Sequence, residues 1–437
     1  MSGNVMKPYD ISASKKQDIK IRKFLPGGIH YNFLTNDTTP RLYFKQANGM
    51  RLIDYDNNEY LDFYGKSGAV FVGHANKHFN EILIDCIQGA LGGDLTEYAY
   101  PVCLYITDYI SCAEQVRFCL SGTECVQNAL RIARVYTGHS TIIRFTGHYH
   151  GSAANVLAQQ TTVPNGLPPL DTNTVELPWN DLHVLQQYVA AQNENIAAII
   201  MEPICINGGG ISSTVEYLKA VRNLCNKYGI LLIFDEIITG VRVGVHGIQG
   251  IVNVSPDICL LGKSIGNGVP VSVIAGSKKI MALYDQCTVV HAGTFNGYPL
   301  GMSAIYATFQ ILTINKSHVY EELCKMTEKL YRILMKEAER AGVPLVLQGC
   351  ENCMVCNCSK DLVRNNRSWT QEIIQRNDIL RKCFQKYGIL LSPVSRIYPN
   401  IMLNENDLDF FQERVRPALA ETYAIIKRTV GFNASKR

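Results

Sequence analysis

The stretch Ile230-Leu-Leu-Ile-Phe-Asp-Glu236 is an uninterrupted apolar run that ends in two acidic residues. A short apolar run that follows a glycine and ends in acid is typical of a fully buried strand. Thr214 precedes the run as the predicted cap of a helix that Gly229 ends. The apolar residues of this helix fall at helical spacing, at Tyr217, Val221, Leu224 and Tyr228. The sequence therefore predicts a helix followed directly by a buried strand.

Two further apolar runs flank this unit and also end in polar residues. Ala197-Ala-Ile-Ile-Met-Glu-Pro203 precedes it, and Ile258-Cys-Leu-Leu-Gly-Lys263 follows it. Strands joined by helical crossovers are parallel, so their carboxyl ends meet at one edge of a sheet. Ligands bind at that edge in open α/β sheets. We therefore expect Glu202, Asp235 and Lys263 to project toward one site.

The chain divides into three stretches of different character. Before about residue 73 the sequence consists of short strands separated by turns, and from about 80 to 309 helices alternate with short apolar strands. This alternation predicts an α/β fold with a mostly parallel sheet. The remainder is mainly helical. We expect the two ends to pack together as a smaller domain, so that residues 1–75 and 316–437 flank a large domain of residues 76–315.

Composition and charge argue against several classes of protein. The chain has 437 residues, a formal net charge of +4, 47% hydrophobic residues and 18% charged residues, which is the balance of a folded globular protein. Its basic residues are scattered rather than gathered into the stripe that nucleic-acid binding needs. Residues 1–23 lack the apolar core of a signal peptide, and no stretch approaches the ~18 consecutive apolar residues of a membrane span. We therefore expect a cytoplasmic protein that binds neither nucleic acid nor membrane.

The chain contains 15 cysteines, which we expect to be free thiols because no secretion signal accompanies them. The tightest cluster consists of Cys350, Cys353, Cys356 and Cys358. Its first two gaps match an iron–sulfur spacing, but the last gap is too short. Apolar residues alternate along this segment, which favours a pair of strands with cysteine as a small buried hydrophobe. We therefore predict no metal site.

An acid at one strand end and a lysine at another indicate a cofactor that is held as a Schiff base. Pyridoxal phosphate needs a lysine whose primary amine bonds to it, and Lys263 is the candidate. It also works best as an electron sink when its ring nitrogen stays protonated, and a buried carboxylate, here Asp235, holds that proton. A structural ion pair between Asp235 and Lys263 is the competing interpretation, and these two residues alone do not decide between them.

The phosphate of such a cofactor needs an anion site. Ser121-Gly122-Thr123 follows an apolar run and opens a predicted helix, whose N-terminus offers free backbone N–H groups. The same residues also form an ordinary helix cap, so this signal alone is weak. Gly262-Lys263-Ser264 is similar to the end of a nucleotide-binding loop, but position 257 is Asp where that loop needs glycine. ATP binding is therefore disfavoured.

Several short motifs are weak singly but become specific through their order and spacing. They are Ser121-Gly-Thr-Glu124, Gly147-His-Tyr-His-Gly151, Glu202-Pro203, Asp235-Glu-Ile-Ile-Thr-Gly-Val-Arg242, Leu261-Gly-Lys263 and Ala292-Gly-Thr294. Together they resemble the class-III aminotransferases, which depend on pyridoxal phosphate, and most closely the glutamate-1-semialdehyde aminomutase branch. The resemblance runs from about Arg41 to Lys427, nearly the whole chain.

The resemblance implies the type-I pyridoxal-phosphate transferase fold. In that fold the large domain binds the cofactor and contains a mostly parallel seven-stranded sheet, and the smaller α+β domain is built from both termini. The working unit implied is a homodimer with shared active sites. Thr294 would reach the phosphate of the cofactor in the neighbouring subunit.

The resemblance also assigns individual residues to the cofactor. Lys263 would bond to it, Asp235 would pair with its ring nitrogen, and Tyr149 would stack on its ring. The residues assigned to its phosphate are Ser121, Gly122 and Thr123. His150 and Glu202 match family positions near the cofactor, and His150 is equally well explained as a structural histidine. Asn207, which follows Glu202-Pro203, is a weaker candidate on the cofactor side.

Two departures from the aminomutase pattern concern the substrate. Where aminomutases carry a glutamate in a loop near the C-terminus, this chain has Ser392-Pro-Val-Ser-Arg-Ile-Tyr398, which contains Arg396 and no acid. Their early tryptophan is also replaced, since the segment here is Gly65-Lys-Ser-Gly68. Arg396 and Ser67 are therefore the candidate substrate residues. A changed pocket on an unchanged cofactor frame indicates a different amino acceptor.

The leading hypothesis is an aminotransferase that moves an amino group from an amino-acid donor, such as glutamate, to an aldehyde or ketone of a small metabolite. Relatives of this kind include enzymes that act on sugar aldehydes in antibiotic biosynthesis, on β-amino acids and on ω-amines. The alternative is an intramolecular aminomutase, against which the missing glutamate counts. A second alternative is a non-catalytic binding relative, against which Lys263, Asp235 and Tyr149 argue.

Overall fold

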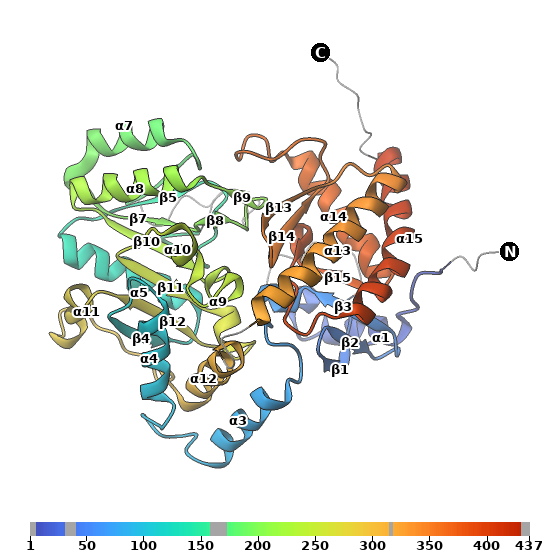
Figure 1. Ribbon diagram of the computed structural model, residues 1–437, viewed down its shortest axis with the longest axis horizontal. Coiled ribbons are helices and arrows are strands. Elements are labelled where there is room, and N and C mark those ends of the chain that lie inside the picture. Colours follow the sequence, from blue (N-terminus) through green and yellow to red (C-terminus); the bar gives the residue numbers. More distant parts are fainter. Residues whose placement is uncertain (1–5, 31–40, 158–172, 314–317, 430–437) are drawn as a thin grey trace.

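The largest sheet of the protein has seven strands in the order β4-β12-β11-β10-β7-β5-β6 (Figure 1). The computed structural model describes residues 6–30, 41–157, 173–313 and 318–429. The strands are β4 (Gln115–Cys119), β5 (Thr141–Phe145), β6 (Thr174–Leu177), β7 (Ile196–Met201), β10 (Leu231–Glu236), β11 (Ile258–Leu261) and β12 (Ser272–Gly276). Neighbours from β11 to β6 are parallel, whereas β12 is antiparallel to both of its neighbours. The predicted α/β fold with a mostly parallel seven-stranded sheet is confirmed.

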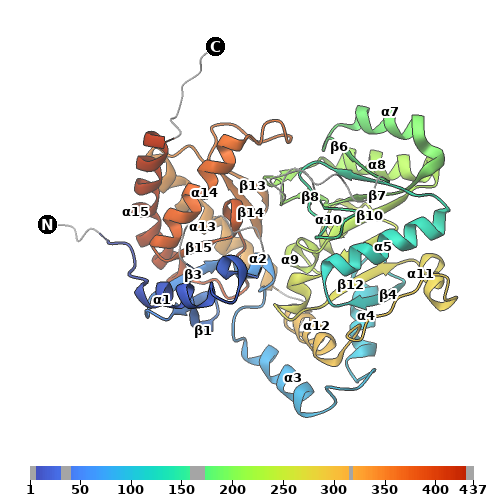
Figure 2. The same cartoon turned by 180° about the vertical axis from the view of Figure 1, so that it is seen from behind.

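Helices cover both faces of this sheet (Figures 1 and 2). On one face lie α5 (Gly122–Thr137) and α11 (Lys278–Asp285), and on the other lie α4 (Ala99–Tyr109), α7 (Leu182–Gln192), α8 (Val215–Tyr228) and α12 (Pro299–Thr313). Leu231 and Ile233 of β10 pack in the core under α5, whereas Leu232 and Phe234 pack in the core under α8. Successive residues of β10 therefore face opposite layers, as the pleat of a strand requires.

The helix and strand predicted around Gly229 form as expected. The side-chain oxygen of Thr214 accepts the backbone N–H of Tyr217 at 3.1 Å and caps α8. Gly229 ends the helix in the left-handed conformation, with φ of 66°. Every residue of β10 is buried. A capping residue at each end of α8 thus sets its length and leads the chain directly into the strand.

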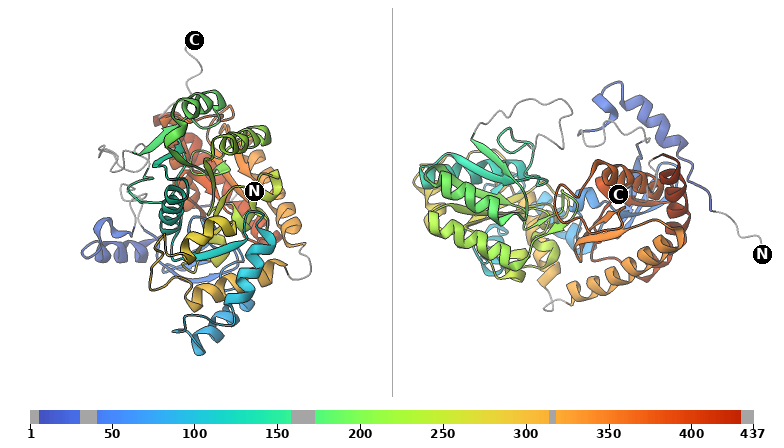
Figure 3. Two further views of the ribbon diagram at one scale, coloured as in Figure 1. Left: turned by 90° about the vertical axis from the view of Figure 1, so that its left-hand side faces the viewer. Right: turned by 90° about the horizontal axis from the view of Figure 1, so that it is seen from above.

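A second, smaller domain contains segments from both ends of the chain (Figures 1 and 3). Its four-stranded sheet has the order β1-β2-β3-β15, in which β15, from the C-terminal part, runs parallel to β3, from the N-terminal part. Its elements are β1 (Phe44–Asn48), β2 (Arg51–Asp54), β3 (Glu59–Phe63), β15 (Ile389–Leu391), α13 (Val319–Ala341), α14 (Gln371–Lys386) and α15 (Glu405–Thr429). The predicted domain boundary between residues 315 and 316 lies outside the described residues, and the boundary between 75 and 76 stays a prediction.

The cysteine-rich segment forms a pair of strands, as the alternation of apolar residues predicts. β13 (Val346–Cys350) and β14 (Cys353–Asn357) are antiparallel, and β16 (Arg396–Ile397) pairs with β14. Cys353, Cys356 and Cys358 have no exposed surface. These cysteines therefore fill the core as small apolar side chains.

The remaining elements are short or lie at the periphery. They are α1 (Ser12–Ile21), α2 (Gly65–Gly68), α3 (Lys77–Gln88), α9 (Gly240–Val243), α10 (Gly247–Val252), β8 (Ile204–Cys205) and β9 (Ile211–Ser212). Among the helices in the described ranges, none is both long enough and apolar enough to cross a membrane.

Candidate functional site

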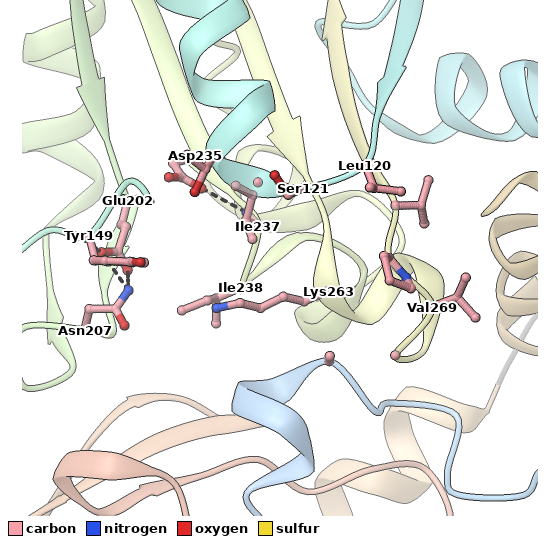
Figure 4. A pocket seen from close by; sticks show the side chains of 17 residues that line it. Leu120, Ser121, Tyr149, Glu202, Asn207, Asp235, Ile237, Ile238, Lys263 and Val269 are labelled. Carbon is pink, nitrogen blue, oxygen red and sulfur yellow. Dashed lines mark hydrogen bonds between the residues drawn. The ribbon is translucent and has the colours of Figure 1, made fainter. Parts of the chain in front are cut away.

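The carboxyl edge of the large sheet carries a pocket of about 290 Å³, close to the lower end of the range for small-molecule sites. Eight of the residues singled out in the sequence line it: Ser121, Gly122, Thr123, Tyr149, Glu202, Asn207, Asp235 and Lys263. In Figure 4 the side chain of Lys263 extends across the pocket, with its amine toward the side where Tyr149 and Asn207 lie. Three strand ends thus bring two carboxylates and one amine together.

Lys263 follows β11 and opens a short 3-10 helix (Lys263–Gly266). Its φ of 46° lies in the left-handed region, which is uncommon for a residue with a side chain and is found at functional sites. Burial in the pocket, and after it the positive charge of Arg396, lower the pKa of Lys263 to about 8. An amine with this pKa is largely neutral in mildly basic solution, and the neutral amine is the form that attacks a carbonyl carbon.

The lowered pKa of Lys263 predicts a pH dependence in the cofactor-free protein. Below pH of about 8 the amine is protonated and unreactive, so covalent attachment of pyridoxal phosphate should accelerate as the pH rises through about 8 and then level off. An unperturbed lysine would continue to accelerate up to about pH 10.4. Stopped-flow absorbance at a series of pH values measures the midpoint.

The same profile in Arg396→Met provides the control. The charge of Arg396 lowers the pKa of Lys263, so its removal should move the midpoint to higher pH. A midpoint near that of a free lysine in the unchanged protein, or one that moves to lower pH in Arg396→Met, would contradict this account.

Asp235 lies on the face of β10 that packs against α5, and its carboxylate sits close to the start of that helix (Figure 4). The residue is 5% exposed. Its Oδ2 lies 2.7 Å from Nδ1 of His150, and its Oδ1 accepts the backbone N–H of Ile237 at 3.2 Å. His150 is itself buried and does not line the pocket, so it fixes the orientation of Asp235. Each carboxylate oxygen keeps a lone pair for a further donor.

The start of α5 forms another wall of the pocket. Ser121 Oγ accepts the N–H of Glu124 at 3.3 Å, and a carboxylate oxygen of Glu124 accepts the N–H of Leu120 at 3.0 Å. The first N–H groups of a helix have no partner within it. Ser121 takes that of Glu124, and those of Gly122 and Thr123 are placed to bind an anion. A side chain at position 122 would displace the side chain of Ile237, because a Cβ there would lie 2.7 Å from Cδ1 of Ile237.

A chain of hydrogen bonds joins Glu202 to the smaller domain. Its Oε1 accepts the backbone N–H of Tyr149 at 2.8 Å, and both of its carboxylate oxygens lie 3.1 Å from the side-chain nitrogen of Asn207. The side-chain oxygen of Asn207 accepts in turn from the guanidinium of Arg396. Burial raises the pKa of Glu202. The Tyr149–Glu202–Asn207–Arg396 chain therefore connects the pocket to the C-terminal loop.

Arg396 is 9% exposed and does not itself line the pocket. Its Nε donates to the carbonyl oxygen of Pro393 at 3.1 Å, and its other contact is with the amide of Asn207. Within the described part of the chain no carboxylate forms an ion pair with it. Since its charge lowers the pKa of Lys263, the guanidinium is a cation beside the pocket, and it has no counter-ion among the residues that the structure describes.

Besides His150 and Arg396, two more residues predicted from the sequence lie outside the pocket. Thr294 is exposed on the loop between α11 and α12, a position that a residue acting on a neighbouring subunit would need. Ser67 is half-buried in the turn formed by α2, where its φ is 61°. It is Ala69, two residues further along, that lines the pocket.

Sequence reasoning missed the apolar part of the pocket. Besides the predicted residues it is lined by Ala69, Leu120, Gly151, Ile237, Ile238, Gly268, Val269, Pro270 and Val271. Ile237 and Ile238 belong to the motif that contains Asp235, but their side chains carry no chemical signal. Gly268, which follows Lys263 and lines the pocket, was a usable signal, because glycine allows a positive φ, here 96°, and a close approach of the backbone to a ligand.

Comparisons with known proteins identify the family of the chain. The family model "Aminotransferase class-III" matches residues 34–419. A glutamate-1-semialdehyde 2,1-aminomutase of Desulforamulus reducens is 33% identical over 89% of this chain and 93% of its own. An ω-transaminase from Sphaerobacter thermophilus superposes with a TM-score of 0.86 at 26% identity, covering 94% of this chain and 98% of its own. A β-phenylalanine aminotransferase from Variovorax paradoxus gives a TM-score of 0.82 at 26% identity, covering 96% and 95%.

The pocket offers the groups that pyridoxal phosphate requires. It holds a lysine amine of lowered pKa for the aldehyde, a buried carboxylate for the ring nitrogen and a helix start for the phosphate. The donor set, the fold and the family match therefore agree on this cofactor. The chain is an enzyme that belongs to the class-III aminotransferases, the pyridoxal-phosphate-dependent family that its motifs resemble.

Proposed function

We propose that the protein is an intermolecular aminotransferase, which takes the amino group of a carboxylated amino acid and transfers it to an aldehyde or ketone. The strongest support for this proposal is the environment of Arg396. It is a buried cation whose charge lowers the pKa of Lys263, and it has no carboxylate partner in the described residues. A buried charge without a counter-ion is costly. A guanidinium in this position is therefore suited to a carboxylate that arrives with the substrate.

Pyridoxal phosphate, when bound, supplies an electron sink for chemistry at the carbon that bears the amino group. The segment from Ser121 to Thr123 would hold its phosphate, and Tyr149 would pack against its ring. Asp235, oriented by His150, would keep the ring nitrogen protonated. Lys263 would serve both for attachment and for proton transfer, because an amine with a pKa of about 8 can accept and return a proton near neutral pH.

Arg396→Ala should weaken the binding of a carboxylated donor by roughly 2–4 kcal/mol, the cost of truncating one partner of a buried charge pair. Rapid mixing of the cofactor-loaded variant with each donor gives the apparent affinity for the donor separately from the rate of the step that follows. A donor amine without a carboxylate, measured on the same variant, is the matched control and should lose much less. Arg396→Lys keeps the charge but not the planar fork, so it should retain part of the affinity.

The acceptor half-reaction gives a second check on this role. An aldehyde or ketone acceptor without a carboxylate should be affected little by Arg396→Ala. Unchanged affinity for the carboxylated donor would show that Arg396 has only a structural role, in which it holds Asn207 and Pro393.

The intramolecular aminomutase is the second candidate, and the sequence comparisons favour it, since the relative from Desulforamulus reducens carries that activity in its name. Two features of this chain argue for transamination instead. The loop that contains Arg396 has no glutamate, and the segment Gly65–Gly68 has no tryptophan, whereas the aminomutase branch carries both. Two observations argue against the non-catalytic alternative. The chain matches the class-III aminotransferase family, and Lys263 and Asp235 line one pocket.

Half-reactions distinguish the two candidates. Purified enzyme is first mixed with a panel of amino acids and amines in the absence of any acceptor. An aminotransferase changes the absorbance of its cofactor and releases one equivalent of carbonyl product per site, and a panel of aldehydes and ketones, sugar aldehydes included, then restores the absorbance. An aminomutase rearranges glutamate-1-semialdehyde over many turnovers without a second substrate. Repeated turnover of glutamate-1-semialdehyde, together with no release of carbonyl product from any donor, would establish the aminomutase instead.

We also propose that the enzyme is a homodimer with shared sites. Large apolar side chains are exposed on α3, on α4, between these helices and on the loop before α12: Ile84, Ile87, Leu91, Leu95, Tyr100, Leu104, Val290 and Phe295. Exposed apolar surface of this kind marks an interaction site, and Thr294 lies next to Phe295. Sedimentation equilibrium should give twice the mass of one chain at micromolar concentration, and a monomer at that concentration would exclude shared sites.

A further inference from the structure

We propose that Cys119, Glu124 and His291 form a binding site for a divalent transition-metal ion, Zn²⁺, behind the start of α5. Their ligand atoms, one from each residue, all lie within 4.8 Å of one another. The thiol and the imidazole are in direct contact, with 3.3 Å between Sγ of Cys119 and Nε2 of His291. None of the three residues lines the pocket described above. The site is therefore independent of the proposed function.

Three separate elements supply these ligands. Cys119 is the last residue of β4 and is 1% exposed. Glu124 lies in the first turn of α5, and His291 lies on the loop between α11 and α12, where both are half-buried. No motif joins residues so far apart in the sequence, which is why the sequence alone predicts no metal site here.

The spacing of the ligand atoms suits a tetrahedral ion. Zinc bonds of ~2.3 Å to sulfur and ~2.0 Å to nitrogen place two ligand atoms roughly 3.5 Å apart at a tetrahedral angle. The 3.3 Å between Cys119 and His291 needs little adjustment to reach that value. One carboxylate oxygen of Glu124 accepts the N–H of Leu120 at 3.0 Å, so the other can bind the ion. Three ligands leave a fourth position for water, as in open zinc sites.

A neighbouring amide indicates which nitrogen of His291 carries the lone pair. The side-chain nitrogen of Asn296 lies 3.1 Å from Nε2 of His291. An amide nitrogen only donates hydrogen bonds, so Nε2 must be the acceptor and must carry the lone pair. The neutral imidazole is the metal-binding form of histidine, and the amide of Asn296 would have to turn away from Nε2 for the ion to take its place. The competing interpretation is a simple hydrogen bond from the thiol of Cys119 to this nitrogen.

A buried hydroxyl on a residue that packs against His291 lacks a hydrogen-bond partner among the described residues. The ring of Tyr284 packs on His291, with 5.2 Å between ring centroids. Tyr284 is 5% exposed, and within the described part of the chain its hydroxyl has no hydrogen-bond partner. Buried polar groups usually have one. A water on the open position of the ion is the kind of partner that this hydroxyl lacks.

A bound ion would connect β4 and α5 to the loop that carries Thr294. That loop is otherwise attached at this point by the contact of His291 with Cys119 and by Arg131 of α5, whose guanidinium donates to the carbonyl oxygen of Val290 at 2.8 Å. Metal coordination is stronger than either hydrogen bond, so the ion would fix the loop to the start of α5. The proposed zinc site therefore lies beside the start of α5 and would hold the loop that carries Thr294 against it.

Zinc binding by the holoenzyme, free of amino acid and previously washed with chelator, tests the proposal. Calorimetric titration with ZnCl₂ should give one ion per chain. Cys119→Ser and His291→Gln should each weaken binding by at least about 100-fold, since even indirect partners of a metal cost 10–100-fold. Cys287→Ser is the matched control, because Cys287 is an exposed thiol on the turn after α11 and should not contribute.

A second measurement uses the unchanged protein and so does not depend on the folding of any variant. It is the visible spectrum after addition of CoCl₂. Tetrahedral Co²⁺ with a sulfur ligand should give strong visible bands at longer wavelength than the cofactor, and these bands should disappear on addition of excess Zn²⁺. The absence of saturable Zn²⁺ binding in the unchanged protein would overturn the proposal. So would Zn²⁺ binding that survives both Cys119→Ser and His291→Gln, or binding that is lost in Cys287→Ser.

Discussion

Lys263→Ala should abolish turnover and remove the covalent bond between the protein and its cofactor. Among the described residues that line the pocket, Lys263 is the only lysine, so no neighbouring amine can replace it. The pocket keeps the helix start and Asp235, and the variant should therefore still bind pyridoxal phosphate without a covalent bond. Reduction with borohydride followed by mass spectrometry of the peptide that contains residue 263 measures the bond directly, and absorbance measures the bound cofactor.

The control for this variant is the same substitution at an exposed lysine of the large domain. Lys219 lies on the outer face of α8 and is exposed, so Lys219→Ala should keep both the bond and the turnover. If the absorbance of lysine-bound cofactor persists in Lys263→Ala, another lysine carries the cofactor and the assignment is wrong. Loss of the bond in both variants would instead indicate a loss of fold, which circular dichroism would detect.

The elements that carry the site could be predicted because their signals are local. α8 has its cap at Thr214 and its stop at Gly229, four residues or fewer from the groups they bind. The run that becomes β10 is apolar throughout because it is buried on both faces. Because β10 and β11 are parallel, Asp235 and Lys263, at their carboxyl ends, lie at the same edge of the sheet. The fold and the two central residues therefore follow from patterns within short segments.

The contacts that shape the substrate side could not be predicted in this way. Arg396 and Asn207 meet although 189 residues separate them, and Cys119 and His291 meet across 172 residues. Each of these pairs joins two loops or strand ends, where neither periodicity nor turn chemistry carries information about the partner. The resemblance to a family pointed to the segment around Ser67, but only the folded turn reveals that Ala69 faces the pocket.

Asp235→Asn should keep the fold and retain bound cofactor, yet slow the chemical step by about 10²-fold or more, the scale on which a lost electrostatic contact at a reacting group lowers a rate. The amide has nearly the same size as the carboxylate and can still accept the hydrogen bond from Ile237. It carries no charge, however, so it cannot stabilise a proton on the ring nitrogen. The rate of the first half-reaction at saturating donor, normalised to cofactor content, measures the effect.

Glu236 provides a matched control for this variant on the same strand. It follows Asp235 directly and points to the opposite face of β10, where its carboxylate accepts the backbone N–H groups of Ile248 and Gln249 at 2.6 and 3.2 Å. Glu236→Gln makes the same chemical change one residue away, so it should lower the temperature of unfolding while the rate per bound cofactor stays within a few-fold of normal. If both variants lost rate in proportion to stability, Asp235 would have a packing role only. A loss of rate confined to Asp235→Asn would show that the rate depends on the charge of this carboxylate and not on its packing in the core.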